Sequence, residues 1–219
     1  MAWWVDAGVD VLVDDQPRDW RAKAVASAPV AASAAPVETR LTLPDTLEAF
    51  VAWRLGPAAP EAAAHGRRVL MEGPVGAPLM AIVDCPDGSA ILEGGASQLF
   101  DRMLTAIGLN RAGICLATFT TARPLAGRIG PELETQLAPL VRRHVALAAP
   151  KRLLIMGASV SRALLGTDGA ARRGSLQRVN LEVGSIEGVA ILPPGTLIAQ
   201  PRGKAEAWRG LQLLIGEKP

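Results

Sequence analysis

The stretch PKRLLIMGASVSRALLG, residues 150–166, decides the fold that we expect for this chain. KRLLIMG is a short apolar run with the length and branching of a buried strand. ASVSRALLG, which follows it directly, is typical of a short helix that ends at Gly166. A strand that leads straight into a helix is the repeating unit of α/β folds, so this stretch predicts that class.

Apolar runs alternate with helical patterns on both sides of this unit. Strands are expected in RRVLME, PLMAIVDC, GICLATFT and GVAILPP, and helices in PDTLEAFVAWRLG, GASQLFDRMLTAIGL, PELETQLAPLVRRHVALAAP and GKAEAWRGLQLLIG. The strands are apolar throughout, as sheets covered on both faces require. We therefore expect an α/β fold, a three-layer α/β/α sandwich around a central, mostly parallel four-stranded sheet.

The composition indicates one domain with an appendage. The chain has 219 residues, 49% of them apolar, which is enough for a core. Its formal net charge of +2 does not by itself indicate nucleic-acid binding. We expect a helical arm at residues 1–22, an Ala/Pro-rich linker at 23–40 and the α/β/α domain at 41–219. The arm carries Trp3, Trp4 and Trp20, which either pack on their own domain or bind a protein partner.

The sequence has no features typical of a secreted, membrane or metal-binding protein. No secretory signal is recognisable, and no uncharged stretch approaches the roughly 20 residues that span a bilayer, so a cytoplasmic protein without membrane contact is expected. The cysteines, Cys85 and Cys115, form no CxxC pair, and we expect neither a metal site nor another cofactor. A neighbouring carboxylate, Asp84, should raise the pKa of the Cys85 thiol, which favours a packing role.

Ligands of parallel sheets bind beyond the carboxyl ends of the strands. Asp84 follows one expected strand and could position water, bind a base edge or cap a loop. Ser159 follows another and could cap the next helix, where the backbone N–H groups also suit a phosphate. Arginines on neighbouring Gly-containing loops could contact a DNA backbone, and these are Arg123, Arg128 and Arg173.

Four segments carry a resemblance to a known family. They are GGASQLFDRMLTAIGLNR, TTARPLAGRIGPELETQLAPL, PKRLLIMGASVSRALLG followed by RRGSLQ, and QPRGKAEAWRGLQLL. By their spacing, residues 68–215 resemble the uracil-DNA glycosylase superfamily, most closely its bacterial iron–sulfur (family 4-like) branch. The resemblance implies a base pocket at the strand ends, where a flipped-out deoxyuridine loses its base by hydrolysis of the N-glycosidic bond.

The resemblance places the base pocket at Asp84, Cys85, Pro86, Leu92, Thr118, Pro193 and Pro194. Most of these positions differ from the family. Leu92 stands where the family stacks uracil under a Phe, and Thr118 where an Asn amide reads the base. Pro193 replaces the His that donates a hydrogen bond to the departing uracil. The cluster cysteines are missing too, for Ala122 precedes the Arg-Pro pair where the family has one of them.

These departures predict a uracil-DNA glycosylase-like protein that has lost catalysis and acts in DNA binding or DNA repair. No residue is assigned as catalytic, and Asp84 is the sole candidate. The alternative is an active DNA glycosylase that removes uracil or another damaged base by a divergent mechanism. A third reading is a partner-binding module that uses the Trp-rich arm.

Overall fold

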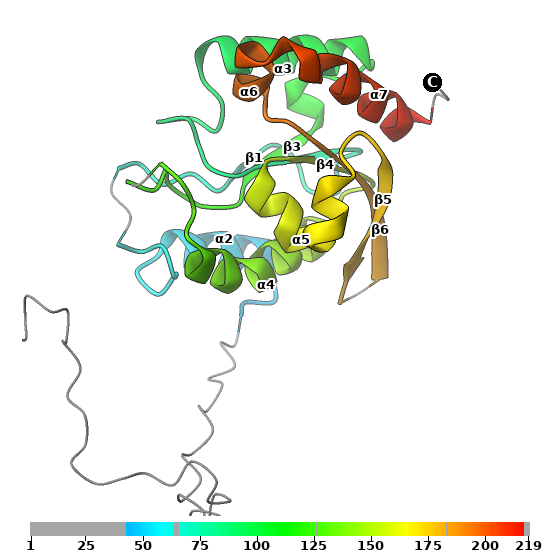
Figure 1. The fold of residues 1–219 in the computed structure, drawn as a ribbon. Coiled ribbons are helices and arrows are strands. Elements are labelled where there is room, and N and C mark those ends of the chain that lie inside the picture. Colours follow the sequence, from blue (N-terminus) through cyan, green and yellow to red (C-terminus); the bar gives the residue numbers. More distant parts are fainter. Residues whose placement is uncertain (1–42, 64–65, 126, 183, 217–219) are drawn as a thin grey trace, which may run out of the picture. The chain divides into compact units, whose positions relative to one another are not determined.

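A computed structural model describes residues 43–63, 66–125, 127–182 and 184–216 (Figure 1). The expected helical arm at 1–22 and the linker at 23–40 lie outside the described residues, so both stay predictions. The described residues belong to one compact unit, Leu43–Pro219. It holds the α/β elements that the sequence predicts.

The sheet has six strands in the order β1-β3-β2-β4-β6-β5. Their bounds are Met71–Glu72 (β1), Met80–Val83 (β2), Cys115–Thr118 (β3), Leu153–Met156 (β4), Leu176–Leu181 (β5) and Gly184–Ile191 (β6). The central strands β3, β2, β4 and β6 run parallel to one another. The edge strands β1 and β5 are antiparallel to their neighbours.

The expectation of a four-stranded sheet is therefore wrong, because two edge strands extend it. Strand β5, LQRVNL, forms a hairpin with β6 and buries only Val179 fully. Three of its six side chains are polar and three are exposed, so the strand contains no continuous apolar run. Strand β1 is only two residues long, at the end of the expected RRVLME run.

Helices cover both faces of the sheet (Figure 1). On one side lie α2 (Leu47–Leu55), α4 (Pro131–Ala148) and α5 (Ala158–Ala171). On the other lie α3 (Gly94–Ala106), α6 (Pro194–Ala199) and α7 (Lys204–Ile215). Short 3₁₀ turns occupy Arg111–Gly113 (η1) and Pro201–Gly203 (η2).

Alternate residues of the central strands pack into two hydrophobic cores, one on each face of the sheet. Met80 and Ile82 pack in the core beneath α2, α4 and α5. Ala81 and Val83, the alternate residues of β2, pack in the core beneath α3, α6 and α7. This is why the central strands are apolar throughout, since both of their faces are buried.

The ends of two helices show how local signals act, and the end of α5 differs from expectation. Helix α2 is capped by Thr46, whose hydroxyl accepts from the N–H of Ala49 at 3.3 Å. The preceding residue, Asp45, pairs with Arg143 of α4. Helix α5 continues beyond Gly166, where the backbone leaves helical geometry at φ 74° and then resumes a helical course. No helix in the described ranges has both the length and the apolar character needed to cross a membrane.

Candidate functional site

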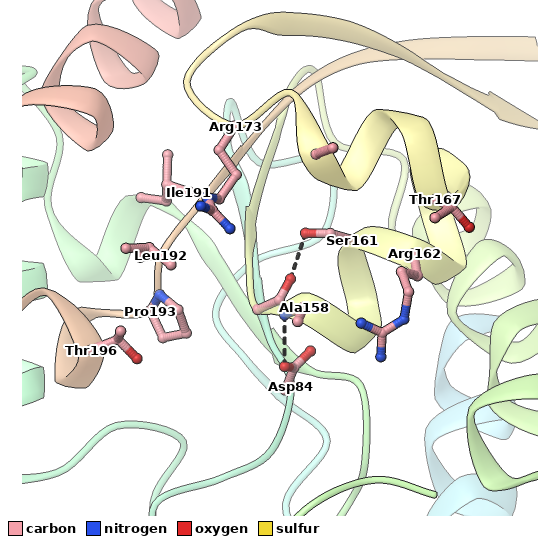
Figure 2. Close-up of a pocket in the computed structure, with 12 residues that line it drawn as sticks. Asp84, Ala158, Ser161, Arg162, Thr167, Arg173, Ile191, Leu192, Pro193 and Thr196 are labelled. Atoms are coloured by element: carbon pink, nitrogen blue, oxygen red, sulfur yellow. Dashed lines mark hydrogen bonds between the residues drawn. The ribbon is translucent and has the colours of Figure 1, made fainter. Parts of the chain in front are cut away.

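A pocket of about 460 Å³ opens at the carboxyl ends of the central strands (Figure 2). Asp84 follows β2, the first turn of α5 follows β4, and Pro193 follows β6. Because β2, β4 and β6 are parallel, these ends meet at one edge of the sheet. The polar side chains that line the pocket are Asp84, Ser161, Arg162, Thr167, Arg173 and Thr196.

The carboxylate of Asp84 caps helix α5 from the neighbouring strand. One oxygen accepts from the N–H of Ala158 at 2.9 Å and of Ser159 at 3.4 Å. The other accepts from the N–H of Val160 at 2.8 Å. The first N–H groups of a helix lack intrahelical partners, and the helix dipole favours a negative charge there. Asp84 thus occupies the position where the sequence led us to consider a phosphate.

Gly157 lets the carboxylate approach this closely. A Cβ atom at this position would lie 2.3 Å from the Cγ of Asp84, well inside contact distance. The backbone of Gly157 also has φ 152°, which side-chain-bearing residues rarely adopt. The strand-to-helix turn and the Asp84 cap therefore depend on each other.

Two opposing influences act on Asp84. Burial raises its pKa, while the hydrogen bonds from Val160, Ser159 and Ala158 and the charge of Arg162 lower it. Burial is the largest of these, so the pKa lies above the ordinary value. A half-buried carboxyl with a raised pKa at a pocket wall has the character of a functional group, although structural carboxylates show it as well.

Arg162 and Arg173 give the pocket its positive charge. The guanidinium of Arg162 forms two hydrogen bonds to the Glu134 carboxylate, at 2.8 and 2.6 Å, and one to the Ser159 hydroxyl at 3.1 Å. Arg173 projects toward Ile191 from the turn after α5 (Figure 2) and pairs with Glu206 at 3.2 Å. Both side chains keep more than two fifths of their surface exposed, so each can still contact an anion.

Ser159 does not take the expected role of capping α5, which Asp84 performs. Ser159 is buried, and its hydroxyl is bonded to Arg162. Ser161 lies in the pocket wall, and its hydroxyl donates to the carbonyl of Gly157 one turn earlier (Figure 2). Ser159 thus helps to hold Arg162 at the pocket edge.

The structure separates the base-pocket positions that the resemblance implies. Asp84 and Pro193 share the pocket wall. Leu92 is 6% exposed and packs in the core beneath α3. Thr118 is 1% exposed, and its hydroxyl donates to the carbonyls of Val69 at 2.9 Å and Leu70 at 3.3 Å. Neither side chain lines the pocket.

The remaining positions lie close to the pocket without lining it. Pro86 and Pro194 are buried, and Pro194 begins helix α6. Cys85 is half-buried, and burial raises the pKa of its thiol more than Asp84 does. The expected direction of that pKa is thus confirmed, while its main cause is different. A thiol with a raised pKa is a poor nucleophile, which fits packing.

The loop arginines differ in their surroundings. Arg123 donates to the Asp87 carboxylate at 3.0 Å and to the carbonyl of Pro86 at 3.4 Å, and so ties two strand-end loops together. Arg128 is exposed on the same loop as Arg123. Arg173 is the one of the three predicted arginines that lines the pocket.

Two residues that line the pocket, Arg162 and Thr196, were not among the predicted site residues. Arg162 follows Ser159 by three positions, so a search one turn into the helix after each strand would have found it. Outside the pocket, the His144 side chain of α4 is also buried, at 1% exposed, and burial together with the charge of Arg54 lowers its pKa to about 3.

In the part of the chain that the structure describes, no three His, Cys, Asp or Glu side chains cluster so that they could hold a metal ion. A scan against protein-family models gave no match to this chain, and a search of curated proteins gave none either.

Proposed function

We propose that this protein binds DNA at the strand-end pocket and does not hydrolyse the N-glycosidic bond. It would be a uracil-DNA glycosylase-like protein with a role in DNA repair. The observation that carries the proposal is the state of Asp84, whose carboxylate is bonded to three backbone N–H groups of α5. A carboxylate that holds a helix in place is poorly available to activate water.

The rest of the pocket supports loss of catalysis. Departure of a base anion needs a donor at the oxygen where charge develops, and losing one such donor costs about a hundred- to a thousand-fold in rate. Of the described residues that line the pocket, none is a histidine, and Pro193 has no N–H to donate. The resemblance places the donor of the family at that position.

The arginines support an anionic ligand. Arg162 and Arg173 both line the pocket and are partly exposed. Lysine and arginine contacts to phosphates supply most of the affinity of non-specific DNA binding and make that affinity depend on salt. The pocket is a concave site at the expected edge of an α/β sheet.

Fluorescence anisotropy with a labelled oligonucleotide tests the binding. We expect salt-dependent binding, weakened several-fold by Arg173→Gln, with a salt slope lower by about one. Arg209→Gln, at an exposed position of α7, is the matched control and should leave affinity nearly unchanged. Binding that is absent at low salt, or that responds equally to both variants, would contradict the proposal.

A uracil-containing oligonucleotide tests catalysis. With enzyme and substrate at equal concentration, we expect no abasic product that alkali could cleave. Cleavage of the strand by this protein would refute the loss of activity while leaving DNA binding intact.

The second candidate function is an active glycosylase that uses Asp84 as its base. The raised pKa of Asp84 and its place in the pocket wall favour this reading. It requires that some oligonucleotide from a damaged-base panel be cleaved and that Asp84→Asn abolish the cleavage. If no panel member is cleaved, or if Asp84→Asn cleaves as well as the unaltered chain, this candidate fails.

A further inference from the structure

A small groove of about 190 Å³ lies between α3, α6 and α7 and shares no lining residue with the strand-end pocket. Its lining is apolar apart from Lys204. The apolar wall consists of Leu99, Met103, Leu197, Ala207, Trp208 and Leu211. An aliphatic groove with a flexible Met and an aromatic edge is typical of surfaces that bind the apolar side of a helix.

Large apolar side chains around the groove remain in contact with solvent. Trp208 is 42% exposed and Ile198 is 48% exposed. On α3, the core takes Phe100 and Leu104, which leaves Leu99 and Met103 only partly buried. Exposed apolar groups that gather at a groove, in place of single scattered ones, indicate an interaction surface.

The charged side chains at the groove, Lys204 and Arg102, are positive, and the nearby carboxylates pair with other arginines. Lys204 is part of the wall, and Arg102 directly precedes Met103 on α3. Neither forms an ion pair with another residue that the structure describes. The nearby acids are engaged elsewhere, Asp101 with Arg111 at 2.9 Å and Glu206 with Arg173 at 3.2 Å.

We propose that this groove binds an acidic amphipathic helix of a partner protein. Apolar side chains spaced three or four residues apart would enter the groove beside Trp208. Carboxylates flanking them would face Lys204 and Arg102, which have no opposing charge of their own. A nucleic-acid base suits the groove less well, because its wall lacks the polar groups that read a base edge.

A synthetic probe tests this in the full chain. The probe is a labelled 16-residue peptide in which Trp and Leu recur every three or four positions among Glu residues. We expect saturable binding by anisotropy that weakens at least tenfold in Trp208→Ala, since a buried aromatic anchor typically carries much of such an interface. Lys204→Glu should weaken it severalfold and reduce its salt dependence.

Two control variants and a control peptide test whether binding depends on the groove and on the charge of the peptide. Leu125→Ala removes a more exposed apolar side chain, 86% exposed, from a loop far along the chain, and should leave the affinity unchanged. Arg209→Glu changes the charge of α7 at a position outside the groove lining and should have a smaller effect than Lys204→Glu. A peptide with Lys in place of every Glu should bind at least tenfold more weakly.

Different results would overturn the proposal or assign the groove to another occupant. Equal binding of the Lys peptide, or equal affinity in Trp208→Ala, would overturn the proposal. A dimer that Trp208→Ala dissociates would assign the groove to a second copy. Tighter peptide binding in a Trp3→Ser, Trp4→Ser variant would assign it to residues 1–22. Displacement of the peptide by a single-stranded oligonucleotide would assign it to nucleic acid.

Discussion

Two carboxylates of this protein, Asp84 and Glu61, are both held by hydrogen bonds, but to different kinds of partner. Asp84 accepts from backbone N–H groups and keeps one side toward an open pocket. Glu61 is 5% exposed and pairs with Arg54, which is 1% exposed. A carboxylate held by backbone N–H groups at a pocket keeps a side that a ligand can reach, whereas one paired with a buried arginine acts within the fold.

The surroundings of Glu61 show what that structural role is. Arg54 also donates to the carbonyl of Phe119 at 3.0 Å, and the N–H of Thr121 donates to Glu61 at 3.3 Å. Arg68 adds a bond to the Thr121 hydroxyl at 3.0 Å and bonds to the carbonyls that end α2. This cluster joins α2 to the loop after β3, and that loop carries Arg123 to the edge of the site.

The largest effect is expected from Glu61→Leu. It leaves Arg54 charged and buried without its partner, which should lower the free energy of unfolding by about 3–5 kcal/mol. Urea denaturation measures this. The Arg54→Met, Glu61→Leu double variant should recover most of the loss, because an apolar pair can replace a buried ion pair. If the double variant is as unstable as the single one, the pair does not act through uncompensated charge.

At the Asp84 site, Gly157→Ala should cost about 2–3 kcal/mol. The added Cβ meets the Asp84 carboxyl at 2.3 Å, and the backbone conformation is strained for alanine. The same substitution in an Asp84→Ala background should cost less, since the clash is gone. A double-mutant cycle by urea denaturation checks this, and strict additivity would contradict the close contact.

Asp84→Ala by itself should cost about 1–2 kcal/mol, as losses of helix caps do. Three N–H groups of α5 lose their acceptor. Asp45→Ala is the control, because the Asp45 side chain is 95% exposed and its ion pair should contribute less than about 1 kcal/mol. Thermal or urea unfolding that ranks Asp45→Ala as the more damaging change would argue against the cap.

The sequence predicted the central strands well and the site only in part. Apolar runs such as LLIM place buried strands directly, because only burial on both faces demands such runs. Strand β5 was missed, since an edge strand needs one apolar face at most. The order of strand ends brought Asp84 and Pro193 together correctly. It could not show that the Thr118 hydroxyl turns to the carbonyl of Val69.

The polar interior was the least predictable part. No local pattern marks Arg54 and Glu61 as buried, because their burial depends on contacts 65 and 60 residues away along the chain, with Phe119 and Thr121. For His144, by contrast, the helical spacing already indicates burial. This residue shares the spacing of Leu137, Leu140, Val141 and Ala148, which form the buried side of α4.

The smallest predicted effect is a pH dependence at His144. Burial lowers the pKa of its imidazole from 6.5 to about 3, so the folded protein keeps it neutral while the unfolded chain takes up a proton. A histidine whose pKa is lower in the folded protein than in the unfolded chain makes the protein less stable as pH falls through its unfolded-state pKa. Between about pH 7 and 5.5 the loss should reach about 1 kcal/mol.

His144→Leu should remove this slope, whatever it does to stability at pH 7. The interval avoids the acid range, where Glu93 and Glu134, whose pKa values are lowered by hydrogen bonds, begin to lose their own stabilising contribution. Urea unfolding of both chains at several pH values gives the comparison. Parallel stability curves for the two chains would mean that His144 is not held neutral in the folded protein, and its burial against Phe50 and Met71 would then need another account.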